Sequence, residues 1–185
     1  ISHFLEHTCF KGTTKRPNSK MINNELDGLG AESNAFTNND YTGFYAKAHT
    51  EKTAQIFDIV SDIYLNSTFP ENEIEKEKGV VIEEINMYED RPQSKVWDIL
   101  SEAVFGDQPA GRTVIGSKET VSSITRADLI EYHKTHYVPE ATVVVVSGKI
   151  DEQNIFSMIE KSFGSQNKES KAVRSKTKDE QNTPK

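Results

Sequence analysis

Apolar residues recur every three or four positions along most of the chain, which is the spacing of a helix that buries one face. In the segment 51–66, for example, Ile59, Val60 and Ile63 fall on the same side. The pattern predicts helices in seven segments, and Thr125 is expected to cap the sixth of them. The segments are 1–10, 19–29, 51–66, 70–89, 94–105, 126–137 and 151–163.

Two other segments carry strand signals. Residues 34–48 are predicted to form a hairpin, with Asn38-Asn39-Asp40 supplying the turn. The run 141–147 is rich in β-branched residues, and its length predicts a buried strand. Helices and strands that mix without regular alternation indicate the α+β class, here a mainly antiparallel sheet flanked by helices.

The length of 185 residues is enough for one domain with its own core. We assign this domain to residues 1–164. The stretch 165–185 contains only Ala172 and Val173 as apolar residues, so it is predicted to be a flexible polar linker or tail. Because the chain opens at Ile1, only two residues before a sharp motif, we expect it to be a piece of a longer protein that is incomplete at its N-terminus.

Charge and cysteine content exclude several classes of protein. The chain has 22 Lys and Arg against 29 Asp and Glu, a net charge of −7. Nucleic acids and anionic membranes attract clustered positive charge, so neither is an expected partner. The single cysteine, Cys9, excludes an internal disulfide framework. One cysteine and no signal pattern favour a cytoplasmic location, with the mitochondrial matrix as the alternative.

The motif His3-Phe4-Leu5-Glu6-His7 carries the sharpest chemical signal. Two imidazoles at i and i+4 lie on one helix face, where both can bind the same zinc ion. Glu6 falls within the same arc and can take a proton from a zinc-bound water, whose pKa the metal lowers. This order is the H-x-x-E-H form of the zinc peptidase motif. Ordinary helices also carry two histidines and a glutamate by chance, so the motif alone leaves both interpretations open.

A catalytic zinc ion needs a third protein ligand, and the acidic segment 70–89 offers several. In a helix, Glu84 and Glu77 lie two turns apart on the apolar side, whereas Glu83 lies on the polar side. A buried carboxylate needs a partner, which a metal would supply. We therefore expect Glu84 to be the third ligand and Glu77 to be a nearby acid that orients or charges the site. The alternative is a solvated acidic helix in which Glu84 only borders the core.

A longer succession of motifs, which covers roughly residues 1–164 in order, resembles the pitrilysin/insulinase family of zinc metallopeptidases, which includes the mitochondrial processing peptidase. The motifs are His3-Phe4-Leu5-Glu6-His7, Phe10-Lys11-Gly12-Thr13, Asn34-Ala35-Phe36-Thr37, Phe44-Tyr45-Ala46-Lys47, the acidic run 75–84, Gly111-Arg112 with Ile115-Gly116, His136-Tyr137 and Val145-Val146-Ser147-Gly148.

The resemblance implies one zinc ion per catalytic domain, held by His3, His7 and Glu84. It also implies that Glu6 is the catalytic base and Glu77 an auxiliary acid. The implied fold is the metallohydrolase domain of the processing peptidases.

The resemblance further implies a substrate site at Asn34, Ala35 and Phe36, the edge of the family's sheet, where a peptide adds as an extra strand. In the family, several strands precede the zinc helix, and a second homologous domain or subunit completes the active site. Neither is found in this sequence.

These observations predict a zinc-dependent endopeptidase that hydrolyses peptides or unfolded protein segments with a glutamate-activated, zinc-bound water. Because the family's second half is absent, we expect this chain alone to be poorly active. The alternatives are a non-catalytic peptide-binding or scaffold subunit of the same family and a zinc hydrolase that acts on a non-peptide substrate.

Overall fold

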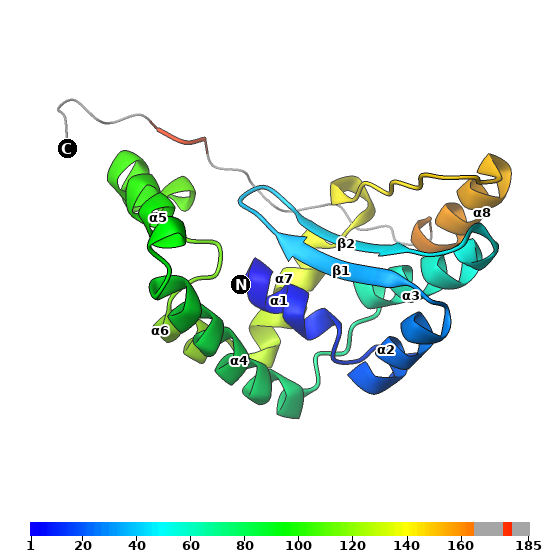
Figure 1. Ribbon diagram of the computed structural model, residues 1–185, viewed down its shortest axis with the longest axis horizontal. Helices are drawn as coiled ribbons and strands as arrows, with labels where there is room; N and C mark the ends of the chain where they lie inside the picture. Colours follow the sequence, from blue (N-terminus) through cyan, green and yellow to red (C-terminus); the bar gives the residue numbers. More distant parts are fainter. Residues whose placement is uncertain (165–175, 179–185) are drawn as a thin grey trace.

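The computed structural model describes residues 1–164 and 176–178 (Figure 1). The elements, in chain order, are α1 (Ser2–Cys9), α2 (Ser19–Gly28), β1 (Glu32–Thr37), β2 (Thr42–Lys47), the 3₁₀ helix η1 (Thr50–Lys52), α3 (Thr53–Leu65), α4 (Glu71–Glu89), α5 (Pro92–Phe105), η2 (Pro109–Gly111), α6 (Lys118–Ser123), α7 (Arg126–His136), η3 (Pro139–Ala141) and α8 (Glu152–Phe163).

Strands β1 and β2 form an antiparallel hairpin whose register runs from Glu32 opposite Lys47 to Thr37 opposite Thr42. The Asn38 side chain accepts hydrogen bonds from the backbone N–H groups of the two residues that follow Asn39, each at 2.9 Å, and so closes the turn. The hairpin runs across α1, with α2, α3 and α8 toward one end and the arm of α4, α5 and α6 on the other side (Figure 1). The class is α+β, as predicted.

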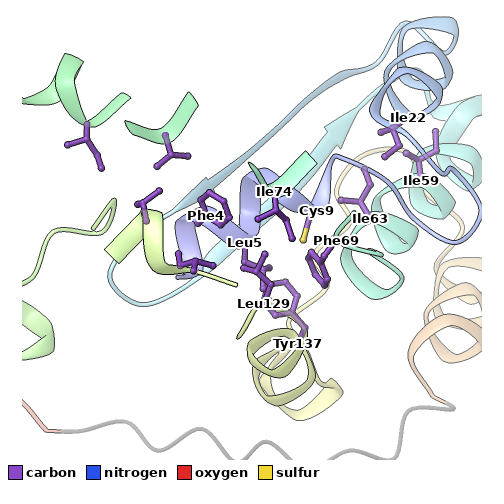
Figure 2. Packing of buried hydrophobic residues seen from close by; sticks show 14 of the residues in the cluster. Phe4, Leu5, Cys9, Ile22, Ile59, Ile63, Phe69, Ile74, Leu129 and Tyr137 are labelled. Carbon is purple, nitrogen blue, oxygen red and sulfur yellow. The ribbon is translucent and has the colours of Figure 1, made fainter. Parts of the chain in front are cut away.

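The core gathers around α1, whose apolar side chains Phe4, Leu5 and Cys9 are completely or almost completely buried. They belong to one cluster with side chains from α3, α4 and α7, among them Ile63 and Ile74 (Figure 2). Because α1 is held on its apolar side by three other helices, its polar side has a defined direction. That side carries the two histidines of the motif.

A partly buried ionic cluster ties the loop after α1 to α2 and α3. The guanidinium group of Arg16 donates hydrogen bonds of 2.8 Å to Glu25 of α2 and to Asp58 and Asp62 of α3. The Thr13 hydroxyl also donates to Asp62, at 2.5 Å. Arg16 and Asp62 are both buried, so the bond between them pairs two charges that water cannot solvate.

The helices predicted from periodicity are present, and each lies close to its expected bounds. The Thr125 side chain accepts from the backbone N–H of Asp128 in a capping box, which confirms it as the N-cap of α7. Helix α6 was not predicted, because its six residues are too few to show a period. Within the described ranges, no helix is both long enough and apolar enough to cross a membrane.

The buried strand predicted at 141–147 is wrong. The segment contains no paired strand, and Val143 and Val145 are 87% and 82% exposed. A buried strand needs a neighbouring strand and a layer of side chains to cover it. In the described ranges the sheet contains only β1 and β2, so one side of this run lies open. The tail predicted at 165–185 lies outside the described residues, apart from 176–178.

Candidate metal centre

Helix α1 places the two histidines of the motif on its polar side, beside each other. The ring centroids of His3 and His7 are 4.6 Å apart. Burial and the neighbouring His7 lower the pKa of His3 to about 4, so this imidazole is neutral at neutral pH. A neutral imidazole has a free lone pair with which to bind a metal.

Helix α4 brings Glu84 to this pair. The Oε2 atom of Glu84 lies 3.7 Å from Nε2 of His3 and 3.6 Å from Nε2 of His7. One ligand atom from each of the three residues falls within 4.8 Å of the other two. Ligand atoms around a tetrahedral zinc ion, each about 2.0–2.1 Å from the metal, stand about 3.4 Å apart. The spacing of this group therefore fits a single zinc ion.

One polar atom of the same group supports this fit. The Oε2 atom of Glu84 is buried and has no hydrogen-bond partner among the described residues. A buried carboxylate oxygen without a partner is costly, and a cation between it and the imidazoles would remove that cost. Two imidazoles and one carboxylate are also a donor set that catalytic zinc sites use, with a fourth position left open.

The second acid of α4, Glu77, lies two turns before Glu84 and contacts one member of the three-residue group, His7. Its Oε1 atom is 2.9 Å from Nδ1 of His7, and its Oε2 atom is 2.6 Å from Nζ of Lys11. Burial favours a higher pKa for Glu77, but the hydrogen bonds from His7 and Lys11 outweigh it and hold the pKa below its usual range. As a carboxylate, Glu77 accepts a hydrogen bond from Nδ1–H of His7, while Nε2 of the same ring faces Glu84.

Glu6 also lies on α1, and it is buried. Burial raises the pKa of its carboxyl group, and the hydroxyl of Thr37, which donates a hydrogen bond to Oε2, opposes the shift. Glu6 is close enough to His7 and Glu84 for their charges to act on it. A carboxyl group with a raised pKa beside a metal site can both accept and return a proton.

The predicted substrate residues lie on β1. Asn34 and Phe36 point to the exposed face of the hairpin, and the Oδ1 atom of Asn34 accepts from the backbone N–H of Ala35. Phe36 is 45% exposed and covers Gly43, where a Cβ atom would come within 2.7 Å of the ring. Ala35 points to the inner face, with Thr37.

Sequence reasoning missed Lys11 and Thr37 as parts of the site. Lys11 lies beyond the end of α1, in a loop whose direction periodicity does not reveal. Thr37 is the last residue of β1 and alternates inward with Ala35. A signal for Thr37 was available, since an inward-facing threonine at a strand end needs a hydrogen-bond partner.

Two adjacent imidazoles, a convergent carboxylate and a nearby buried glutamate on an α+β scaffold are an arrangement typical of zinc hydrolases. Comparison with known proteins agrees. The profile described as "Insulinase (Peptidase family M16)" matches residues 1–118, and the profile "Peptidase M16 inactive domain" matches residues 123–185. The chain belongs to the insulinase family, peptidase family M16.

Individual relatives support the assignment. The chain is 42% identical over 173 residues to "Uncharacterized zinc protease YmxG" of Bacillus subtilis, a match over 94% of this chain and 42% of that protein. It is 36% identical to the mitochondrial-processing peptidase subunit beta of Neurospora crassa, over 88% of this chain and 34% of that protein. The structure of a protease from Helicobacter pylori shares the fold, with a TM-score of 0.86 at 22% identity, over 96% of this chain and 43% of that chain. The chain thus spans less than half the length of these relatives.

Proposed function

We propose that this chain carries the zinc site and the general base of a zinc-dependent endopeptidase. The observation that supports this most is the convergence of Nε2 of His3, Nε2 of His7 and Oε2 of Glu84 from two separate helices. Membership of peptidase family M16 and the similarity to proteins named zinc proteases point in the same direction.

Each residue has a separate part in the proposed reaction. His3, His7 and Glu84 hold the ion, and Glu77 orients His7 through its Nδ1 atom. When bound, zinc supplies a Lewis acid that lowers the pKa of a water and polarises the peptide carbonyl. Glu6 takes the proton of the attacking water and later gives it to the leaving amine.

The proposed substrates are peptides or unfolded protein segments. In the described ranges β1 pairs only with β2, so its other edge is open for a peptide to add as a strand along Asn34, Ala35 and Phe36. Backbone pairing of this kind accepts many sequences. We also propose that a second homologous domain or subunit completes the active site, since the relatives are more than twice as long as this chain.

The test combines zinc content with cleavage of a quenched fluorescent peptide by the full-length protein. We expect one zinc ion per domain, and Glu6→Gln should abolish cleavage while the zinc remains bound. Glu84→Gln should lose zinc, whereas the matched control Glu83→Gln, on the exposed side of the same helix, should keep both zinc and activity. Normal cleavage by the Glu6→Gln variant would refute the proposed mechanism.

A second candidate, a non-catalytic peptide-binding or scaffold subunit, is favoured by the profile that matches residues 123–185, which describes an inactive domain. The same experiment separates the two candidates. A scaffold subunit would bind the peptide with equal affinity in the wild type and in Glu6→Gln, and neither would cleave it. Zinc binding with hydrolysis of a non-peptide ester but of no peptide would favour a different zinc hydrolase.

A further inference from the structure

Two threonines lie at the turn end of the hairpin, next to Glu6. Thr37 and Thr42 are the last pair of the register, at the strand ends next to the turn. The Thr37 hydroxyl donates to Oε2 of Glu6, and its Oγ1 atom lies 3.1 Å from Oγ1 of Thr42. The hairpin therefore contacts the buried glutamate of α1 through a side chain that is part of β1 itself.

The order of donors in this chain of hydrogen bonds follows from proton count. A threonine hydroxyl has one proton, and a carboxylate can only accept. Because Thr37 uses its one hydroxyl proton in the hydrogen bond to Glu6, Thr42 must be the donor in the bond between the two hydroxyls. The chain therefore runs from Thr42 to Thr37 to Glu6, and each member restrains the next.

The strand makes this restraint stiff. Threonine is branched at Cβ, so its χ1 angle is restricted, and β1 and β2 hold both backbones in register. The contact engages Oε2 of Glu6 and so restrains the direction in which the carboxylate points. A base that is held in one rotamer needs no reorganisation before proton transfer.

We propose that Thr37 is a positioning residue that fixes the carboxylate of Glu6, and that Thr42 supports it. This inference rests on the proposed function, in which Glu6 is the general base. The inference also gives strand β1 a second role besides peptide binding. A peptide that pairs with β1 would bind to the same strand that holds the base, so that substrate binding and the orientation of Glu6 are mechanically linked.

The test uses Thr37→Val, which removes the hydroxyl but keeps the shape, and Thr37→Ser, which keeps the hydroxyl. In the full-length protein we expect Thr37→Val to lower kcat by about 10- to 100-fold, the effect of a slightly misplaced catalytic group, with KM and zinc content unchanged. Thr37→Ser should recover kcat to within about threefold, because the donor is restored. Thr42→Val should cause a smaller loss than Thr37→Val.

The matched control is Thr142→Val. Thr142 is also half-buried and bonded to a side chain, the hydroxyl of Tyr64 at 2.8 Å, but it lies outside the site. Its kcat should equal that of the wild type. Wild-type kcat in Thr37→Val would overturn the inference, and so would a Thr37→Ser variant as slow as Thr37→Val.

A readout without catalysis separates this inference from the proposed function. In the metal-free protein, the unfolding free energies of Thr37→Val, Glu6→Leu and the double variant should be non-additive, because each substitution removes one partner of the same hydrogen bond. Additive effects would refute the contact. If wild type and Glu6→Gln were equally inactive, the proposed function would fail, and this cycle would still decide whether Thr37 holds Glu6.

Discussion

Lys11 shows how a single residue outside the motif can govern the metal centre. Its ammonium group lies 2.6 Å from Glu77, which in turn lies 2.9 Å from Nδ1 of His7. Burial favours a higher pKa for Glu77, but the hydrogen bond from His7, together with the hydrogen bond and charge of Lys11, holds that pKa below its usual range. Lys11 thus helps to keep Glu77 the anion that holds the imidazole of His7. Such partners of metal ligands typically change metal affinity by about 10- to 100-fold.

We therefore expect Lys11→Met to weaken zinc binding by about tenfold, as measured by competition with a chromophoric chelator. Lys11→Arg keeps the positive charge, so its loss of zinc affinity should be much smaller. Lys15→Met is the matched control, because Lys15 comes from the same loop but pairs with the exposed side of Asp58. Unchanged affinity in Lys11→Met would mean that His7 alone holds Glu77.

At this scale the sequence could indicate which residues share a helix face but not which loop residues reach them. Helical spacing correctly separated Glu84, beside the histidines, from the exposed Glu83. The contacts of Lys11 and Thr37 depend on where a loop turns and how two strands pair. Neither has a period that a linear pattern can display.

At the scale of elements, the site depends on how α1 is held by its neighbours. The loop after α1 is tied to α2 and α3 through Arg16, which bonds to Glu25, Asp58 and Asp62. Asp62 is inaccessible to solvent, so the loss of Arg16 would leave a buried carboxylate short of a partner. Since α1 carries His3 and His7, this cluster supports the metal centre from a distance.

Arg16→Met should lower the free energy of unfolding by about 3 kcal/mol near neutral pH, measured by urea denaturation. Burial favours a higher pKa for Asp58, but the hydrogen bonds from Lys15 and Arg16 outweigh it and hold that pKa below its usual range. A depressed carboxyl pKa stabilises the fold above the unfolded-state value of about 3.9, and that stability is lost as the pH falls through the folded value. The difference between wild type and Arg16→Met should therefore narrow below about pH 4. If the difference in unfolding free energy between wild type and Arg16→Met stayed constant down to pH 2, the proposed stabilisation of the Asp58 carboxylate by Arg16 would be wrong.

Element types were predictable where a pattern repeated over several turns, and less so where it did not. The period of 3.6 located α3, α4 and α7, and a β-branched run alone misplaced a strand at 141–147. Residues of that run still alternate between more and less exposed positions, as in an extended chain. What sequence pattern could not supply was the neighbouring strand, because pairing is a property of two segments rather than one.

At the scale of the whole molecule, the metal would join two helices that the core already holds together. The apolar cluster around Phe4, Leu5 and Ile74 does not include the three proposed ligands. The fold should therefore survive without zinc, unlike small domains that fold only around their metal. Zinc should nevertheless stabilise it, because an ion that binds the folded state alone shifts the unfolding equilibrium by mass action.

The prediction is a zinc-dependent melting temperature with an unchanged metal-free fold. At a free zinc concentration about 1,000 times the dissociation constant, the gain is about 4 kcal/mol, which for a domain of this size raises Tm by roughly 10 °C. Calorimetry should show this shift in wild type and in Glu83→Gln, and circular dichroism should show equal helix content with and without a chelator. The shift should disappear in Glu84→Gln, since the carboxylate that draws the two imidazoles into one donor set is lost. A full zinc-induced shift in Glu84→Gln would mean that the histidines bind the ion without α4, and the link between α1 and α4 through the metal would be wrong.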